Sequence, residues 1–156
     1  MPRRKYKKPK RSTVDPKYND PVIGLTINNI LKRGKKSLAE SLMYDALNLV
    51  EKKTGKPGTE VFQSAIRNIT PAVMVKSRRV GGATYQVPVE LQHDKARNLA
   101  IRWLLQYSRD RKGASFPERL SEEIIDAAEN RGGAIKKKSD THKMAEANKA
   151  FSHYRF

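Results

Sequence analysis

Apolar residues follow a helical period along most of this 156-residue chain, and the period changes to two in one segment. From Val73 to Val89 apolar and polar residues alternate, and Gly81-Gly82 separates the two halves. This alternation predicts a β-hairpin over about residues 72–90. Pro88 suits an exposed ribbon but not a central strand, and a lone hairpin does not build a sheet. The predicted fold class is therefore mostly α, with one protruding hairpin.

Six helices are predicted, three before the hairpin and three after it. Asp20-Pro21 begins the first, and Gly34 is expected to end it. Residues 37–40 and 115–118 have the form of capping boxes, which predicts starts for the second and fifth helices. In the last helix, the apolar residues expected to face inward are Met144, Ala147 and Phe151. The third and fourth helices are expected at about 57–69 and 93–109.

The length of the chain fits one domain, which we expect to be a six-helix bundle-like unit over residues 15–156. Residues 1–14 form a Lys- and Pro-rich arm that is expected to be disordered until a partner orders it. The sequence contains no cysteine, which excludes disulfides and thiolate metal sites. No apolar stretch is long enough to cross a bilayer, so no membrane partner is expected.

Positive charge dominates the chain, with 33 Lys and Arg against 16 Asp and Glu and a formal net charge of +17. Such a charge is self-repulsive unless a polyanion neutralises it, and nucleic acid is the abundant cellular polyanion. The basic residues of the arm that are predicted to bind nucleic-acid phosphates are Arg3, Arg4, Lys5, Lys7, Lys8, Lys10 and Arg11.

The excess of positive charge continues into the folded part, where further residues are predicted to bind the phosphates of a nucleic acid. They are Lys35, Lys36, Lys76, Lys95, Arg102, Arg109, Arg111, Lys136, Lys137 and Lys138. The hairpin tip is a separate cationic element that is suited to a groove or a backbone. Its predicted contact residues are Arg78, Arg79, Val80, Gly81, Gly82 and Tyr85. Tyr85 is open to two interpretations, because it either stacks on a base or packs the hairpin.

Signals for catalysis or cofactor binding are weak. Residues 34–37 resemble the end of a phosphate-binding loop, but the glycine that the motif needs at position 29 is Asn29. None of the three histidines has a metal-ligand partner at helical spacing, and each is expected at the surface or facing a phosphate. Glu122, Asp126 and Glu129 share a helix face, which fits a solvated surface or a basic partner protein better than a metal or acid–base cluster. We expect no enzyme activity, metal or cofactor.

Three separate segments resemble the family of small-subunit ribosomal protein seven, bacterial and plastid type. They are residues 20–46 with Gly34-Lys35-Lys36, the hairpin motif at 77–88, and the stretch from Ala134 to Asn148 with its three consecutive lysines. The resemblance covers about residues 12–156. It implies a six-helix protein with a protruding hairpin that binds small-subunit ribosomal RNA and nucleates assembly of the head domain.

The resemblance also implies partners. It places the hairpin near the exit-site tRNA and the messenger path, and it implies small-subunit ribosomal proteins nine and eleven as neighbours. The protein would then act as a monomer within the ribosome, in the bacterial cytoplasm or the plastid stroma.

Two other classes of function fit parts of the sequence. An architectural DNA-binding protein also uses a basic arm and hairpin, but such hairpins usually carry an apolar wedge, and this tip offers only Val80. An RNA-processing enzyme needs a nucleophile, metal cluster or cofactor loop, and none is identifiable. The lead hypothesis is therefore a structural RNA-binding protein of the ribosome.

Overall fold

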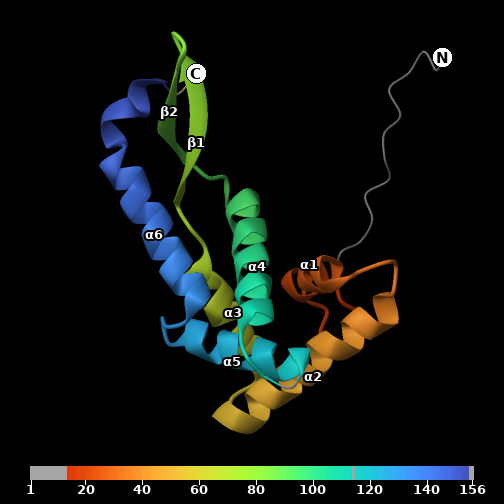
Figure 1. The fold of residues 1–156 in the computed structure, drawn as a ribbon. Helices are drawn as coiled ribbons and strands as arrows, with labels where there is room; N and C mark the ends of the chain where they lie inside the picture. The colour runs from red at the N-terminus through yellow and green to blue at the C-terminus, as the bar shows by residue number, and fades with distance from the viewer. Residues whose placement is uncertain (1–13, 114, 155–156) are drawn as a thin grey trace, which may run out of the picture.

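The computed structural model describes residues 14–113 and 115–154, and it confirms a mostly helical fold with one antiparallel hairpin after the third helix (Figure 1). The predicted arm lies outside these residues, apart from Val14. The elements, in chain order, are α1 (Pro21–Ile30), α2 (Lys36–Thr54), α3 (Gly58–Ile69), β1 (Val73–Val80), β2 (Ala83–Glu90), α4 (His93–Asp110), α5 (Phe116–Ala128), α6 (Gly133–Ala147) and the 3₁₀ turn η1 (Lys149–Tyr154).

The core of the helical body lies around α5, which packs against α2, α3 and α4. Phe62 of α3, Leu104 of α4 and Ile124 of α5 are completely buried there. On each of these helices the buried side chains recur every three or four positions, so each helix presents one apolar face to the others. No helix of the described residues is both long and apolar enough to cross a membrane.

The start of α1 is as predicted, whereas its end is not. The Asp20 carboxylate accepts hydrogen bonds from the backbone N–H groups of Val22 and Ile23, at 2.6 and 3.4 Å. The helix ends at Ile30, so the prediction of an end at Gly34 was wrong. Gly34 instead lies in the loop to α2 with a φ of +76°, a conformation that glycine adopts without steric cost.

The predicted capping box at residues 37–40 was also wrong. Helix α2 begins one residue earlier, at Lys36, and no side chain caps its first turn. Leu38, on the first turn of α2, is 53 % exposed, whereas Leu47 of the same helix is buried. The capping box of α5 is confirmed, because Ser115 and Glu118 each accept the other's backbone N–H.

The hairpin has the predicted position, and its strands pair in register from Val73 opposite Glu90 to Val80 opposite Ala83. The hairpin does not stand apart from the rest of the protein, because α6 runs beside β1 and η1 lies against β2 (Figure 1). Tyr85 packs against Phe151 and Tyr154 of η1, with ring centroids 5.2 and 5.1 Å apart.

Helix α6 covers the helical body only near its beginning. Gly133 approaches the ring of Tyr107 so closely that a side chain there would collide with it. Ala134 and Ala145 are the buried residues of this helix, whereas Met144 and Ala147 are exposed. The prediction that these two face inward was therefore wrong, because the helix leaves the body to run along the hairpin. Phe151 is half-buried against the hairpin, so its apolar contact is with a strand.

Candidate nucleic-acid interface

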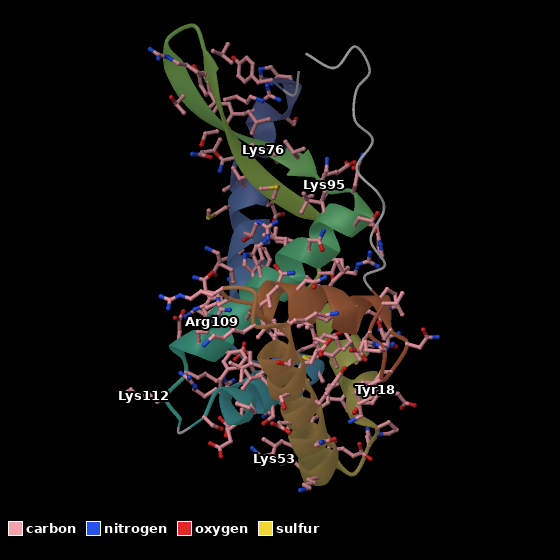
Figure 2. The ribbon with its side chains drawn as sticks, turned by 90° about the vertical axis from the view of Figure 1, so that its right-hand side faces the viewer. Tyr18, Lys53, Lys76, Lys95, Arg109 and Lys112 are labelled. Atoms are coloured by element: carbon pink, nitrogen blue, oxygen red, sulfur yellow. The ribbon has the colours of Figure 1, made fainter. Side chains whose placement is uncertain are left out.

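Exposed basic side chains extend over the length of the molecule. Figure 2 shows Lys76 on the hairpin, Lys95 and Arg109 at opposite ends of α4, and Lys112 and Lys53 beyond them. Of the predicted RNA-binding residues that the structure describes, eight are exposed to solvent: Lys35, Lys36, Lys76, Lys95, Arg102, Arg109, Lys136 and Lys137. The positively charged surface therefore spans the hairpin, the loop before α2, α4 and α6.

One part of this surface is concave. A depression of about 400 Å³ lies between α1 and α4, lined by Asn29 on one side and by Arg102, Leu105, Gln106, Arg109 and the carboxylate of Asp110 on the other. Arg102 and Arg109 are seven positions apart on one helix and so project from the same face. Two guanidinium groups beside two amides suit a sugar–phosphate backbone, because arginine binds phosphate with two parallel hydrogen bonds.

The loop between α1 and α2 presents a second group of cations, Lys32, Arg33, Lys35 and Lys36. Arg33 has a φ of 53°, in the left-handed region, and Gly34 follows it in the same region. Lys36 forms an ion pair with Glu40 at 3.4 Å. We did not predict Lys32 and Arg33 from the sequence, although the charge run that contains Lys35 and Lys36 also contains them.

The hairpin tip is exposed from Lys76 to Arg79 and from Gly81 to Thr84. Arg78 and Arg79 are consecutive strand residues, so they project from opposite faces of the ribbon. Gly81 and Gly82 both have positive φ, which allows the tight turn between the strands. Tyr85 lies opposite Arg78 in register and contacts η1, which supports the interpretation that it packs the hairpin.

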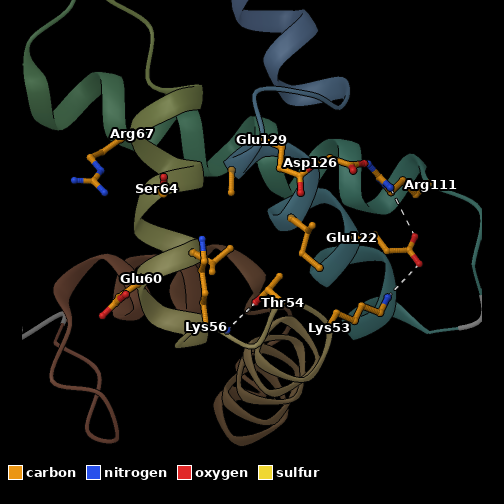
Figure 3. Close-up of a pocket in the computed structure, with 13 residues that line it drawn as sticks. Lys53, Thr54, Lys56, Glu60, Ser64, Arg67, Arg111, Glu122, Asp126 and Glu129 are labelled. Atoms are coloured by element: carbon orange, nitrogen blue, oxygen red, sulfur yellow. Dashed lines mark hydrogen bonds and ion pairs between the residues drawn. The ribbon is translucent and has the colours of Figure 1, made fainter.

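Arg111 differs from the other predicted residues, because its guanidinium group faces carboxylates (Figure 3). Its Nε donates to Glu123 Oε2 at 2.6 Å, and its other nitrogens pair with Asp126 and, at 3.7 Å, with Glu122. Burial alone would lower the pKa of Arg111, but the hydrogen bonds to Asp126 and Glu123 outweigh it and raise the pKa. We therefore assign Arg111 to an internal ion-pair network and not to the RNA-binding surface.

Two further polar side chains of α6 fasten it, one to the end of α3 and one to the residue before β1. Lys138 is half-buried, and its Nζ donates to the backbone carbonyl of Asn68 at 2.6 Å. His142 Nε2 accepts a hydrogen bond from the backbone N–H of Ala72 at 3.2 Å. Burial and the charge of Lys138 lower the pKa of His142, so the ring stays neutral and able to accept. His142 is thus a partly buried surface residue whose ring holds the backbone just before β1.

The acidic face of α5 lines a groove of about 860 Å³ between the end of α2, α3 and α5 (Figure 3). Asp126 pairs with Arg111, and Glu122 lies between Arg111 and Lys53, 3.5 Å from the lysine. Glu129 pairs with Arg131. No group of carboxylates and histidines within residues 14–113 and 115–154 is arranged to hold a metal ion.

A helical body with a broad cationic surface and a cationic hairpin is typical of a nucleic-acid-binding protein. Comparison with known proteins gives the particular family. The model of the family described as ribosomal protein S7p/S5e matches residues 2–149, so the chain belongs to that family. This confirms the resemblance seen in the sequence.

Curated relatives agree with this assignment. Proteins called small ribosomal subunit protein uS7 are 56 % identical in Pelotomaculum thermopropionicum, 55 % in Acetivibrio thermocellus and 53 % in Gloeothece citriformis, each over the full length of both chains. Members of this family are structural, non-enzymatic components of the small subunit that bind ribosomal RNA in translation. The bacterial type of the relatives implies a ribosome-associated protein of the cytoplasm.

Proposed function

We propose that this protein binds small-subunit ribosomal RNA early in assembly and nucleates folding of the head domain. The observation that carries the proposal is that exposed basic side chains lie on α4, on α6, in the loop before α2 and on the hairpin. Cations on four separate elements can contact several RNA segments at once, and so favour one arrangement of them. Neutralising many phosphates releases counterions and supplies the affinity.

The exposed hairpin tip has a separate role in this proposal. Helix α6 and η1 hold the hairpin as far as Tyr85, which lies opposite Arg78, while Arg79 and the glycine turn extend beyond that contact. A cationic turn on an anchored ribbon suits contact with RNA that is not part of the assembly site. We assign it to the exit-site tRNA and the messenger path, and we assign small-subunit proteins nine and eleven as neighbours of this monomeric protein. Family membership favours RNA over DNA as the polyanion, and the bacterial cytoplasm over the plastid stroma.

The experiment distinguishes a role in assembly of the small subunit from a role in tRNA binding by the assembled ribosome. Small subunits are reconstituted with wild-type protein, with a variant whose hairpin is shortened between residues 78 and 84, and with Arg102→Gln/Arg109→Gln as the matched removal of two charges. We expect the shortened hairpin to allow assembly and to reduce occupancy of the exit site by tRNA. We expect the α4 variant to slow assembly, with normal tRNA occupancy in the particles that form. Failure of the shortened variant to assemble, with normal occupancy in the remaining particles, would contradict the assigned role of the hairpin.

A further inference from the structure

The surface of the loop before α2 contains an apolar hollow that the electrostatic account of RNA binding leaves unused. The hollow has a volume of about 330 Å³, and the buried side chains of Ile30 and Ala39 and the half-buried Leu42 form its floor. Leu38 lies on the first turn of α2 at its side and is 53 % exposed. We call this feature the Leu38 hollow. Exposed leucines are usual singly, but this one borders a concave apolar surface.

The rim of the Leu38 hollow is cationic. Lys32, Arg33 and Lys35 line it, and no described carboxylate forms an ion pair with any of the three. The neighbouring Lys36, which does have such a partner in Glu40, is not among the lining residues. An occupant that matches this arrangement has a flat apolar part for the floor and negative charge at its edge. Each nucleotide of RNA combines these two features in a base and its phosphates.

We propose that the Leu38 hollow receives one unstacked base of the ribosomal RNA, with the adjoining phosphates on Lys32, Arg33 and Lys35. The proposal rests on the proposed function, because it assigns a base-binding site within the RNA-binding surface. Sequence-specific RNA recognition commonly uses unpaired bases that leave the stack and lie on side chains. An aliphatic floor accepts such a base without hydrogen bonds, so the hollow selects an unpaired nucleotide by shape and not by base identity.

The decisive measurement is the affinity of the protein for a transcript of the small-subunit ribosomal RNA, titrated over a range of salt concentrations. Leu38→Ala should lower the affinity about fivefold, since the base would cover less apolar surface, and leave the slope of log affinity against log salt unchanged. Lys35→Ala should instead reduce that slope by about 0.7 to 0.9. Met144→Ala is the matched control, because Met144 is 52 % exposed on α6 and lies outside the hollow. It should change neither quantity.

A second variant tests stacking directly. Leu38→Trp should bind at least as tightly as wild type, because bases stack on aromatic rings, and single-stranded oligouridylate should quench its fluorescence. The wild-type protein gives the background fluorescence of the natural Trp103, which is 8 % exposed. Circular dichroism and thermal melting of each variant show whether its fold is intact.

Three results would overturn the proposal: a Leu38→Ala affinity equal to that of Met144→Ala, a lower affinity accompanied by a smaller salt slope, or an unquenched Leu38→Trp. Normal RNA binding by Leu38→Ala with failed incorporation into reconstituted subunits would show that a protein occupies the hollow, and would also overturn it. Failure of the wild-type protein to bind the transcript would contradict the proposed function itself.

Discussion

Glu123 illustrates how a single buried charge is stabilised in this protein. Only 1 % of its surface is exposed, yet both carboxylate oxygens have donors. Oε2 accepts from Arg111 at 2.6 Å, and Oε1 accepts from the backbone N–H of Ala134 at 2.9 Å. One side chain on α5 therefore links the end of α4 to the first turn of α6. A buried ion pair adds little net stability against an apolar replacement, but removal of one partner leaves an uncompensated charge.

Glu123→Ala should destabilise the protein by about 1 to 3 kcal/mol, because the buried backbone N–H of Ala134 would lose its acceptor, whereas Arg111 would keep its pairing with Asp126. Glu122→Ala is the control, since this half-exposed carboxylate lies 3.7 Å from Arg111 and its removal should cost under about 1 kcal/mol. The free energy of unfolding from urea titrations measures both effects. Equal values for the two variants would contradict the assigned role of Glu123.

His142 makes stability depend on pH. Its pKa in the folded protein is lowered from the ordinary 6.5 by burial and by Lys138, so the unfolded chain binds the proton more readily. Its contribution is therefore present above pH 6.5 and is lost as the pH falls through the folded pKa. The difference in unfolding free energy between wild type and His142→Gln should shrink as the pH is lowered from 7.5 to 5. A difference that stays constant over this range would show that protonation of His142 is not coupled to folding.

Among the elements, α4 shows how one helix serves both the core and the RNA surface. Ala100, Trp103 and Leu104 are buried on one side, whereas Arg102 and Arg109 are exposed on the other. The 3.6-residue period separates these two sets, so the helix has a continuous apolar stripe and a continuous cationic stripe. Mutations one position apart are thus expected to have different consequences.

Trp103→Ala should lower the free energy of unfolding by about 3 to 5 kcal/mol, because it removes a large buried side chain. Arg102→Ala should leave that energy unchanged and weaken binding to ribosomal RNA. Thermal melting and filter-binding measurements on the two variants provide the comparison. Equal melting temperatures with a shared decrease in RNA affinity would reverse the inward and outward assignment of this helix.

For the whole molecule, the 33 basic residues outnumber the 16 acidic residues that could pair with them, which leaves a net charge of +17. Arg111 and Lys138 contribute to the fold, while most of the predicted cations of α4, α6, the hairpin and the loop before α2 remain exposed. Repulsion among these exposed charges is relieved when RNA binds. Binding of RNA should for this reason stabilise the protein as well as assemble the subunit.

Deletion of residues 1–11 tests the share of the arm in this electrostatic binding. These residues lie outside the described structure, and we expect the remaining chain to fold, because the arm has no apolar residues to bury beyond Met1, Tyr6 and two prolines. The affinity should fall for all RNA sequences, and the salt slope should flatten by about 0.7 to 0.9 for each phosphate that the arm no longer neutralises. A scrambled arm of the same composition is the control and should retain both values. Unchanged affinity and slope after deletion would show that the arm binds no phosphates.

Local sequence determined the features that depend on neighbours three or four positions away. The helical periods, the alternation of the hairpin, the Asp20 cap and the capping box at Ser115 were all predictable, because backbone hydrogen bonds and side-chain faces within an element follow from spacing. The exposure of most of the predicted cations followed from the same periodicity. The capping box predicted at residues 37–40 shows the limit, because the same local pattern does not begin α2.

Tertiary structure decided every feature whose partners are distant in sequence. Lys138 and Asn68 are 70 positions apart, as are His142 and Ala72, so no local pattern predicts that these side chains fasten α6 to the end of α3 and to the start of the hairpin. Arg111 became part of the ion-pair network because α5 brings three carboxylates to it. Leu38 remained exposed, and Leu47 was buried, because the packing of α2 on α5 selects which apolar residues of a helix are covered. A helix has several possible apolar faces, and only its neighbours in the fold choose among them.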